Sequence, residues 1–435
     1  MNILAINPWI YDFAAYDFWL KPYGFLVILT YLKNKGINVD YIDCLDKKIT
    51  KADFGRGKYP AQIIEKPSIF KQIPRHFKRY GISIDELKGA LKKTNYDYIL
   101  ITSSMTYWYP AIIDLIKILR AKFGASKIIL GGTYATLCYG HAKKTTGCDF
   151  VFKDSSLKEF FSLLNVDFNY TQFYSTLPSY EDFYTTLDYV VLRTCWGCPF
   201  DCSYCAIKEL FTGFFRVPHK KVIEFIAKYH QSGIKNFILY DDAFLYEPNY
   251  AKQLLRQIIN LKLDIHFHTP NALHLKFLDK DIACLLKKSN FINPHFGLET
   301  LNPYLQKLWG DKVNKSDLRR GVNLLKKGGF RKGEFSVYLL LGYPNQNLEE
   351  LKKEVDMLHC LGAKVSLAEF SPVPKTKIFQ NYKDNFNEPL SHNNSVFGSF
   401  QQDKIKDFWE IKNYVRQLNK ELSLGNKGVI SDIKS

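Results

Sequence analysis

Short apolar runs alternate with amphipathic stretches along this chain, and the alternation predicts strands that alternate with helices. Residues 3–6 form a first apolar run, Leu26, Leu29 and Leu32 recur at helical spacing, and residues 39–42 form a second run. A strand, a helix and a second strand within roughly forty residues make a βαβ unit, and such units build parallel sheets. The N-terminal part of the chain is therefore predicted to be an α/β domain.

A long insertion interrupts the alternation of strand and helix patterns, which resumes after it. Residues 46–80 break the alternation and end in a basic stretch, and an insertion of this length in an α/β domain favours a lid or a docking segment. Beyond it, residues 98–102 and 127–130 are again apolar runs that read as strands. We expect the first domain to span residues 1–170 and a linker to span residues 171–185.

Six further apolar runs, each followed by polar residues, glycine or proline, predict a second domain. They lie at residues 189–192, 236–240, 264–268, 291–296, 335–341 and 364–370. Helical patterns between them predict a partial (β/α)₆ TIM-type barrel over residues 186–385, with its site at the carboxyl ends of the strands. An amphipathic pattern from about residue 401 to 424 predicts a C-terminal helical tail within residues 386–435, packed over the barrel mouth or a partner subunit.

Composition narrows the functional classes. The net charge of +17 points to a nucleic-acid or anionic partner, but the lysines are scattered along the chain, so nucleic acid is not favoured. The N-terminus has no signal-peptide pattern and no apolar run reaches the length of a membrane span, so we expect no membrane segment. Nine cysteines, mostly placed singly, favour the reducing cytoplasm over a disulfide framework.

Three cysteines stand close together in a CxxxCxxC pattern, namely Cys198, Cys202 and Cys205. Soft thiolates on so short a loop suit three irons of a four-iron, four-sulfur cluster, and the fourth iron is left without a protein ligand. An open iron can bind S-adenosylmethionine and pass an electron into its sulfonium, which releases a 5′-deoxyadenosyl radical. Zinc is the alternative, with Cys195 as a fourth thiolate, although no second CxxC pair follows.

The residues around these cysteines resemble the radical S-adenosylmethionine enzymes, in the subgroup with an N-terminal cobalamin-binding-type domain. The resemblance rests on an aromatic residue before the last cysteine, on residues 193–200, and on the later segments Gly297-Leu298-Glu299, Gly342-Tyr343-Pro344 and Ser371-Pro372-Val373-Pro374. It implies that Cys198, Cys202 and Cys205 bind a [4Fe-4S] cluster. It also implies that five residues help to bind S-adenosylmethionine, namely Tyr204, Asp241, Asp242, Glu299 and Gly342.

The N-terminal domain carries its own part of the resemblance, in residues 7–8, 21–24, 103–104 and 131–133. Similarity to the cobalamin-binding domain of the subgroup implies a Rossmann-like (flavodoxin-like) parallel sheet. Cobalamin would be bound at its strand ends by Ser103, Ser104, Gly131, Gly132 and Thr133.

One feature of many cobalamin proteins is missing from this sequence. They carry a DxHxxG loop whose histidine ligates the cobalt, and neither His76 nor His141 has that context. Two alternatives stay open at this point. Either cobalamin binds with no protein histidine on cobalt, or the domain keeps the fold and has lost the cofactor.

The resemblance therefore implies a cytoplasmic radical enzyme. With cobalamin, the expected reaction is methylation of an unactivated carbon, and without it the reaction could be rearrangement, cyclisation or sulfur insertion. A zinc-binding nucleic-acid protein is the alternative from a different class. An enzyme of this kind also needs a reducing electron donor, such as a ferredoxin or flavodoxin. The sequence names neither the substrate nor a catalytic residue.

Overall fold

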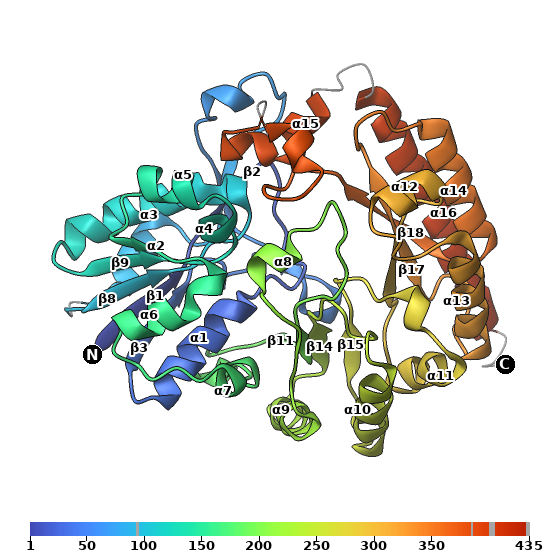
Figure 1. Cartoon of the computed structure of the whole chain (residues 1–435), viewed down its shortest axis with the longest axis horizontal. Coiled ribbons are helices and arrows are strands. Elements are labelled where there is room, and N and C mark those ends of the chain that lie inside the picture. Colours follow the sequence, from blue (N-terminus) through green and yellow to red (C-terminus); the bar gives the residue numbers. More distant parts are fainter. Residues whose placement is uncertain (93–94, 384–385, 400–404, 432–435) are drawn as a thin grey trace.

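The computed structural model describes residues 1–92, 95–383, 386–399 and 405–431. Two α/β parts lie side by side, and a segment near the C-terminal end returns from the second part to the first (Figure 1). Within the described residues, no helix combines the length and the apolar character needed to cross a membrane.

The first part is built on a parallel sheet of five strands in the order β10-β9-β8-β1-β3. Its strands are β1 (Asn2–Asn7), β3 (Asn38–Asp43), β8 (Tyr98–Ile101), β9 (Lys127–Leu130) and β10 (Phe150–Val151). The direction of the strand order reverses between β1 and β8, and sheets of this kind bind ligands beside that point, at the carboxyl ends of the strands. The predicted flavodoxin-like sheet is confirmed. The pattern missed β10, which has only two residues.

Helices cover both faces of this sheet, which explains why its strands are apolar on both sides. Ile3 and Ala5 pack in the cluster formed with α1 and α6, whereas Leu4 and Ile6 point to the opposite cluster formed with α3. The helices of this part are α1 (Tyr23–Asn34), α2 (Ile84–Ala90), α3 (Tyr109–Lys122), α4 (Thr133–Leu137), α5 (Tyr139–Thr145), α6 (Leu157–Leu163) and α7 (Tyr170–Tyr174). The expected linker thus overlaps a short helix that packs on α1.

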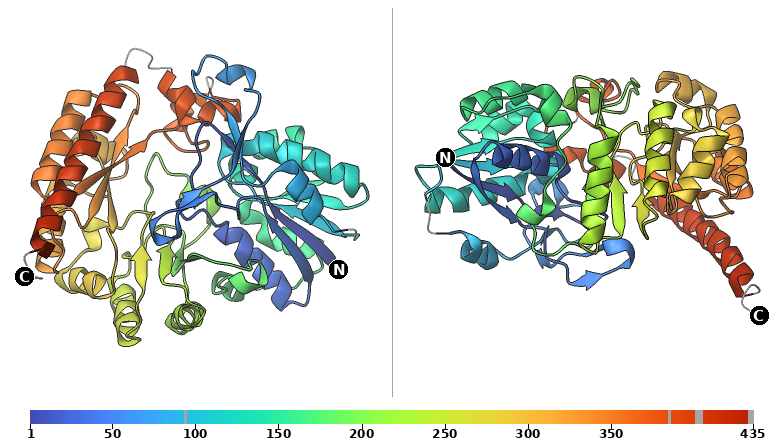
Figure 2. Two further views of the ribbon diagram at one scale, coloured as in Figure 1. Left: turned by 180° about the vertical axis from the view of Figure 1, so that it is seen from behind. Right: turned by 90° about the horizontal axis from the view of Figure 1, so that it is seen from below.

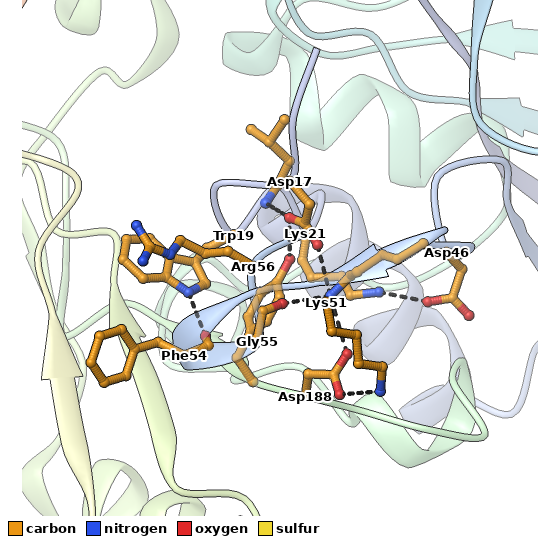
Figure 3. A network of polar contacts seen from close by, with 12 residues as sticks. Asp17, Trp19, Lys21, Asp46, Lys51, Phe54, Gly55, Arg56 and Asp188 are labelled. Atoms are coloured by element: carbon orange, nitrogen blue, oxygen red, sulfur yellow. Dashed lines mark hydrogen bonds and ion pairs between the residues drawn. The ribbon is translucent and has the colours of Figure 1, made fainter. Parts of the chain in front are cut away.

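The insertion forms small antiparallel strands. Strand β7 (Lys78–Tyr80) pairs with β6 (Ala61–Ile63) and with β2 (Ile10–Asp12), which lies outside the insertion, and β4 (Thr50–Lys51) pairs with β5 (Gly57–Lys58). Figure 3 shows how it is held: Lys51 pairs with Asp188 at 2.7 Å, and the Trp19 indole donates to the Phe54 carbonyl at 2.9 Å. The Phe54 ring lies 4.7 Å from that of His268 in the second part. The insertion therefore connects the two parts of the chain.

The second part contains six parallel strands in chain order. They are β11 (Val190–Leu192), β14 (Asn236–Leu239) and β15 (His266–His268) in one sheet, and β16 (His295–Glu299), β17 (Ser336–Leu341) and β18 (Lys364–Glu369) in another. Parallel bridges from Phe267 to Phe291 and from Leu273 to Phe296 join the two sheets. The outer helices are α9 (His219–Gln231), α10 (Pro248–Asn260), α11 (Lys280–Lys288), α13 (Lys315–Lys327) and α14 (Leu348–Cys360).

The fourth strand of this part begins later than its apolar pattern predicts. Phe291 bridges to β15, but the chain then turns at Asn293, whose φ is 46°, and resumes as β16 only at His295. A non-glycine residue in the left-handed region interrupts a strand, because extended pairing needs a negative φ. The apolar pattern could not show this interruption.

The C-terminal region divides between the two parts. Helix α16 (Ile405–Ser431) packs on α14 and β18, along the side of the barrel away from the first part (Figure 2). The Asn419 side chain bonds both the N–H and the carbonyl of Val365, at 2.9 and 2.8 Å, and so covers the edge of β18. The start of the predicted helix, at residues 401–404, lies outside the described residues.

The segment before α16 contains α15 (Asn394–Ser399) and docks on the first part. His392 shares a hydrogen bond with the Thr106 hydroxyl at 2.9 Å, and the Asn393 amide donates to Asp12 at 3.0 Å. Residues 386–399 therefore form a strap across the two parts rather than part of a tail.

Candidate functional site

The three cysteines lie on the loop that follows β11 and the short strand β12 (Cys195–Trp196), which pairs with β13 (Phe215–Arg216). Gly197 opens the loop with a φ of 78°, and a Cβ there would lie 2.1 Å from the Gly213 carbonyl oxygen, so only glycine fits. Within the loop, the Cys205 N–H donates to the Cys202 carbonyl at 3.0 Å. This turn holds the second and third cysteines on one bend of the chain.

The three thiols also act on one another electrostatically. Cys198 and Cys202 are half-buried, and burial together with the neighbouring Cys202 and Cys205 thiols raises the pKa of Cys198 to about 11. In the part of the chain that the structure describes, no three His, Cys, Asp or Glu side chains converge closely enough to hold a single metal ion. A four-iron cluster takes each thiolate on a different iron, and its binding would displace the thiol protons.

Cys195 points away from this group. It is completely buried in β12, and its N–H donates to the Asp241 carboxylate at 2.5 Å. Burial, followed by the charge of Asp241, raises the pKa of its thiol. The zinc alternative needs Cys195 beside the other three thiols, and this placement does not supply it.

Asp241 anchors the start of the cluster loop. It is 3% exposed at the carboxyl end of β14, and one carboxylate oxygen accepts the N–H groups of Thr194, at 2.7 Å, and Cys195. The other oxygen accepts the Thr194 hydroxyl at 2.9 Å. Both oxygens are thus already engaged, which gives this predicted ligand-binding residue a supporting position beneath the loop.

Asp242 takes a different position from its neighbour. It pairs with Arg193 from the end of β11. Its negative charge also contributes to raising the pKa of Cys198 and of Cys205. Burial raises its pKa, whereas Arg193 opposes the rise. The pair therefore lies beside the cluster loop, where two neighbouring strands of the barrel end.

Glu299, Tyr204 and Lys312 form a second group beside the cysteines. One Glu299 oxygen accepts the Tyr204 hydroxyl at 2.7 Å and the Lys312 ammonium at 2.6 Å, whereas Oε2 is buried and has no hydrogen-bond partner among the described residues. Glu299 has a φ of 68° at an irregularity of β16. This strained backbone conformation orients its side chain toward Tyr204 and Lys312. Although burial opposes it, the charges of Glu299 and Cys202 raise the pKa of Lys312.

Glu299 Oε2 is therefore an acceptor without a donor next to the cluster loop. A bound ligand with hydroxyl groups would need such an acceptor. The sequence predicted Tyr204 and Glu299 but not Lys312, which looks like one more surface lysine in a basic stretch. For Gly342, the structure shows that its N–H donates to the Gln346 side chain at 2.6 Å and that it faces the Phe408 ring of α16.

A cavity of about 370 Å³ opens between the two parts of the chain. One wall comes from the carboxyl ends of β8, β9 and β10 and from the start of α1. The opposite wall comes from the ends of β11 and β14 and from α8 (Ile207–Leu210), which directly follows the cluster loop (Figure 1). All five residues predicted for cobalamin line it, namely Ser103, Ser104, Gly131, Gly132 and Thr133.

The two glycines serve this cavity differently. A Cβ on Gly131 would meet nothing within 4 Å, so the missing side chain leaves space that belongs to the cavity. Gly132 has a φ of 92°, and a Cβ there would lie 2.3 Å from the Ser103 carbonyl oxygen. Gly132 therefore lets the ends of β8 and β9 approach each other, while Gly131 keeps the space between the walls open.

Several further lining residues were not among those predicted to bind cobalamin. They are Tyr23, Asp154, Tyr174, Arg193 and Trp196, of which Asp154 and Tyr174 come from segments that the sequence did not connect with a site. The Tyr23 hydroxyl is buried and has no hydrogen-bond partner within the described ranges, so a donor faces this region unused. A large ligand with polar arms fits such a cavity, which has mostly apolar walls and a few polar groups.

Comparison with known proteins extends these observations. Residues 194–358 match the model of the Radical SAM superfamily. The chain is similar to the radical S-adenosylmethionine methyltransferase TsrM from Kitasatospora setae, solved with cobalamin and a [4Fe-4S] cluster bound, with a TM-score of 0.63 and 16% identity over 87% of this chain and 77% of that one. It is also similar to the cobalamin-dependent S-adenosylmethionine radical enzyme OxsB, solved with aqua-cobalamin bound. The TM-score is 0.57, and the identity is 13% over 89% of this chain and 56% of that one. At these identities the likeness shows the fold.

Curated relatives match a shorter stretch. An uncharacterized methyltransferase, PH0819, of Pyrococcus horikoshii is 24% identical over 47% of this chain and 45% of its own length. The ribosomal protein uS12 methylthiotransferase RimO of a Hydrogenobaculum species is 23% identical over 49% of this chain and 58% of its own length. The chain thus spans about half the length of the curated relatives that it matches.

Proposed function

We propose that this chain, whose residues 194–358 match the model of the Radical SAM superfamily, is a radical S-adenosylmethionine enzyme that moves a methyl group from a bound corrinoid to an unactivated carbon. The observation that carries the proposal is the cavity at the strand ends of the first sheet, which opens beside the cluster loop. Arg193 and Asp242 line that cavity, and the charge of Asp242 also reaches Cys198 and Cys205. A ligand in the cavity would therefore lie next to the cluster loop.

In this proposal, Cys198, Cys202 and Cys205 hold a [4Fe-4S] cluster through three of its irons. When bound, the cluster supplies an electron that cleaves S-adenosylmethionine to a 5′-deoxyadenosyl radical, and the corrinoid supplies the methyl group. Asp241 keeps the loop in place through its bonds to Thr194 and Cys195. An outside reductant, such as a ferredoxin or flavodoxin, has to deliver the electron.

The chain's own residues would orient S-adenosylmethionine. The free Oε2 of Glu299 can accept hydroxyl groups of its ribose, while Tyr204 and Lys312 hold the other oxygen. Asp242 can accept its ammonium group beside the cluster loop. Lys312 places a positive charge next to Cys202, which offsets the negative charge that thiolates bring to the loop.

The corrinoid would lie against Ser103, Ser104, Gly131, Gly132 and Thr133. The side-chain-free face of Gly131 leaves it room, and Ser104 and Thr133 bring hydroxyl groups to the wall of the cavity, whereas the Ser103 hydroxyl donates to the Gly131 carbonyl at 2.6 Å. Leu100 and Ile129, deeper in the cavity, offer apolar contact.

The experiment that tests this proposal blocks the cavity without disturbing the backbone. Gly131→Leu places a side chain in open space that belongs to the cavity, and Gly140→Leu, on the exposed surface of α5, is the matched control with equally open space around its Cβ. Each protein is reconstituted anaerobically with iron, sulfide and hydroxocobalamin, desalted, and measured for visible absorption and for dithionite-driven 5′-deoxyadenosine. We expect Gly131→Leu to lose the corrinoid and Gly140→Leu to retain it.

The wild-type result separates the alternatives. A protein that forms 5′-deoxyadenosine but never retains the corrinoid would contradict methyl transfer and leave rearrangement, cyclisation or sulfur insertion. A colourless protein with stoichiometric zinc would overturn the radical enzyme altogether.

A further inference from the structure

The charged side chains that line the cavity are mostly neutralised. Five of them face it, namely Lys21, Lys153, Asp154, Arg193 and Asp242. Arg193 pairs with Asp242, and Lys21 pairs with Asp46 at 2.8 Å (Figure 3). These three lining charges are therefore already compensated by the protein.

Asp154 and Lys153 are the exceptions, since neither has an ion-pair partner among the described residues. The Lys153 ammonium lies over the Tyr139 ring, 4.7 Å from its centroid. Asp154 thus places a carboxylate with no ion-pair partner at the wall of a cavity with mostly apolar walls.

The position of Asp154 is set by its backbone. Its N–H donates to the Thr136 hydroxyl at 2.9 Å, directly after β10 ends, and that hydroxyl donates to the Gly132 carbonyl at 3.0 Å. Burial raises the pKa of Asp154 to about 6, so the carboxyl group is mostly ionised at neutral pH. A partly buried carboxylate with no cation paired to it is unfavourable, and N–H groups of a ligand would relieve that cost.

We propose that Asp154 accepts N–H hydrogen bonds from a carboxamide arm of the corrinoid and thereby selects amidated corrinoids over those with carboxylate arms. This inference rests on the proposed binding of a corrinoid in the cavity. A carboxamide has two N–H donors and no charge, so it satisfies the carboxylate. A carboxylate arm would instead bring a second negative charge next to Asp154, whose neighbour Lys153 is engaged with the Tyr139 ring.

Two corrinoids that differ in their arms provide the test. Cobinamide carries carboxamide arms, cobyrinic acid carries carboxylate arms, and both lack the nucleotide tail. Binding of each to the full-length, cluster-reconstituted protein is measured by equilibrium dialysis at neutral pH, with the visible absorption of the corrinoid as the readout. Asp154→Asn removes the negative charge but keeps the size of the side chain and the backbone N–H. Asp167→Asn is the control, since it removes the same charge from a side chain that is 92% exposed and does not line the cavity.

The wild type is expected to bind cobinamide at least about tenfold more tightly than cobyrinic acid, because hydrogen bonds to a charged group are worth roughly ten- to hundredfold in affinity. Asp154→Asn should weaken the binding of cobinamide and strengthen that of cobyrinic acid, while Asp167→Asn keeps the wild-type ratio. An unchanged ratio in Asp154→Asn overturns this inference alone. A wild type that binds neither corrinoid overturns it together with the proposed corrinoid site.

Discussion

The support that Asp241 gives to the cluster loop can be measured directly. In Asp241→Ala, the N–H groups of Thr194 and Cys195 lose their acceptor while they remain buried. Each such group costs about 1–3 kcal/mol, so the loop should lose about 4 kcal/mol of local stability. Asp241→Asn should cost far less, because the amide oxygen can accept both N–H groups and its NH₂ can donate to the Thr194 hydroxyl.

Hydrogen–deuterium exchange of a peptide that covers residues 190–197 is the assay, on protein without a cluster. A loss of about 4 kcal/mol raises exchange by roughly a thousandfold, and the Asn variant should stay within about tenfold of the wild type. Exchange in Asp241→Ala within a factor of ten of the wild type would refute the anchoring role. If Asp241→Asn exchanged as fast as the alanine variant, the charge rather than the hydrogen bonds would hold the loop.

Three further results follow from the geometry. Cys202→Ala should abolish 5′-deoxyadenosine formation and lower the iron content after reconstitution, whereas Cys195→Ala, which removes the thiol beneath the loop, should keep the iron content of the wild type. Gly132→Ala should lower the free energy of unfolding by roughly 2 kcal/mol, since its φ of 92° and the nearby Ser103 carbonyl exclude a Cβ, and urea unfolding of the apo-protein measures it. Burial lowers the pKa of His392 from 6.5 to about 4, so below pH 6.5 the unfolded chain gains a proton that the folded chain does not. Stability should therefore fall by up to about 3 kcal/mol between pH 6.5 and pH 4, and His392→Gln should lose less over the same range in thermal unfolding.

The sequence by itself determined the local features of this protein. Apolar runs predicted both parallel sheets because a strand buried on both faces has to be apolar throughout, and the C-terminal helix was visible in its 3.6-residue period. The spacing of Cys198, Cys202 and Cys205 predicted a cluster loop because three ligands within eight residues depend on local geometry alone. The residues around Gly131 were found for a similar reason, since the ends of parallel strands meet at one edge of the sheet.

Only the tertiary structure decided what lies between these features. Lys312 beside Glu299, and Asp154 in the cavity, come from segments whose residue types also suit an ordinary surface or helix start. The two carboxylates of β14 look equivalent in the sequence, but Asp241 supports the loop and Asp242 faces the cavity. Adjacent residues at a strand end point in opposite directions, and their roles depend on which partner the fold brings to each side.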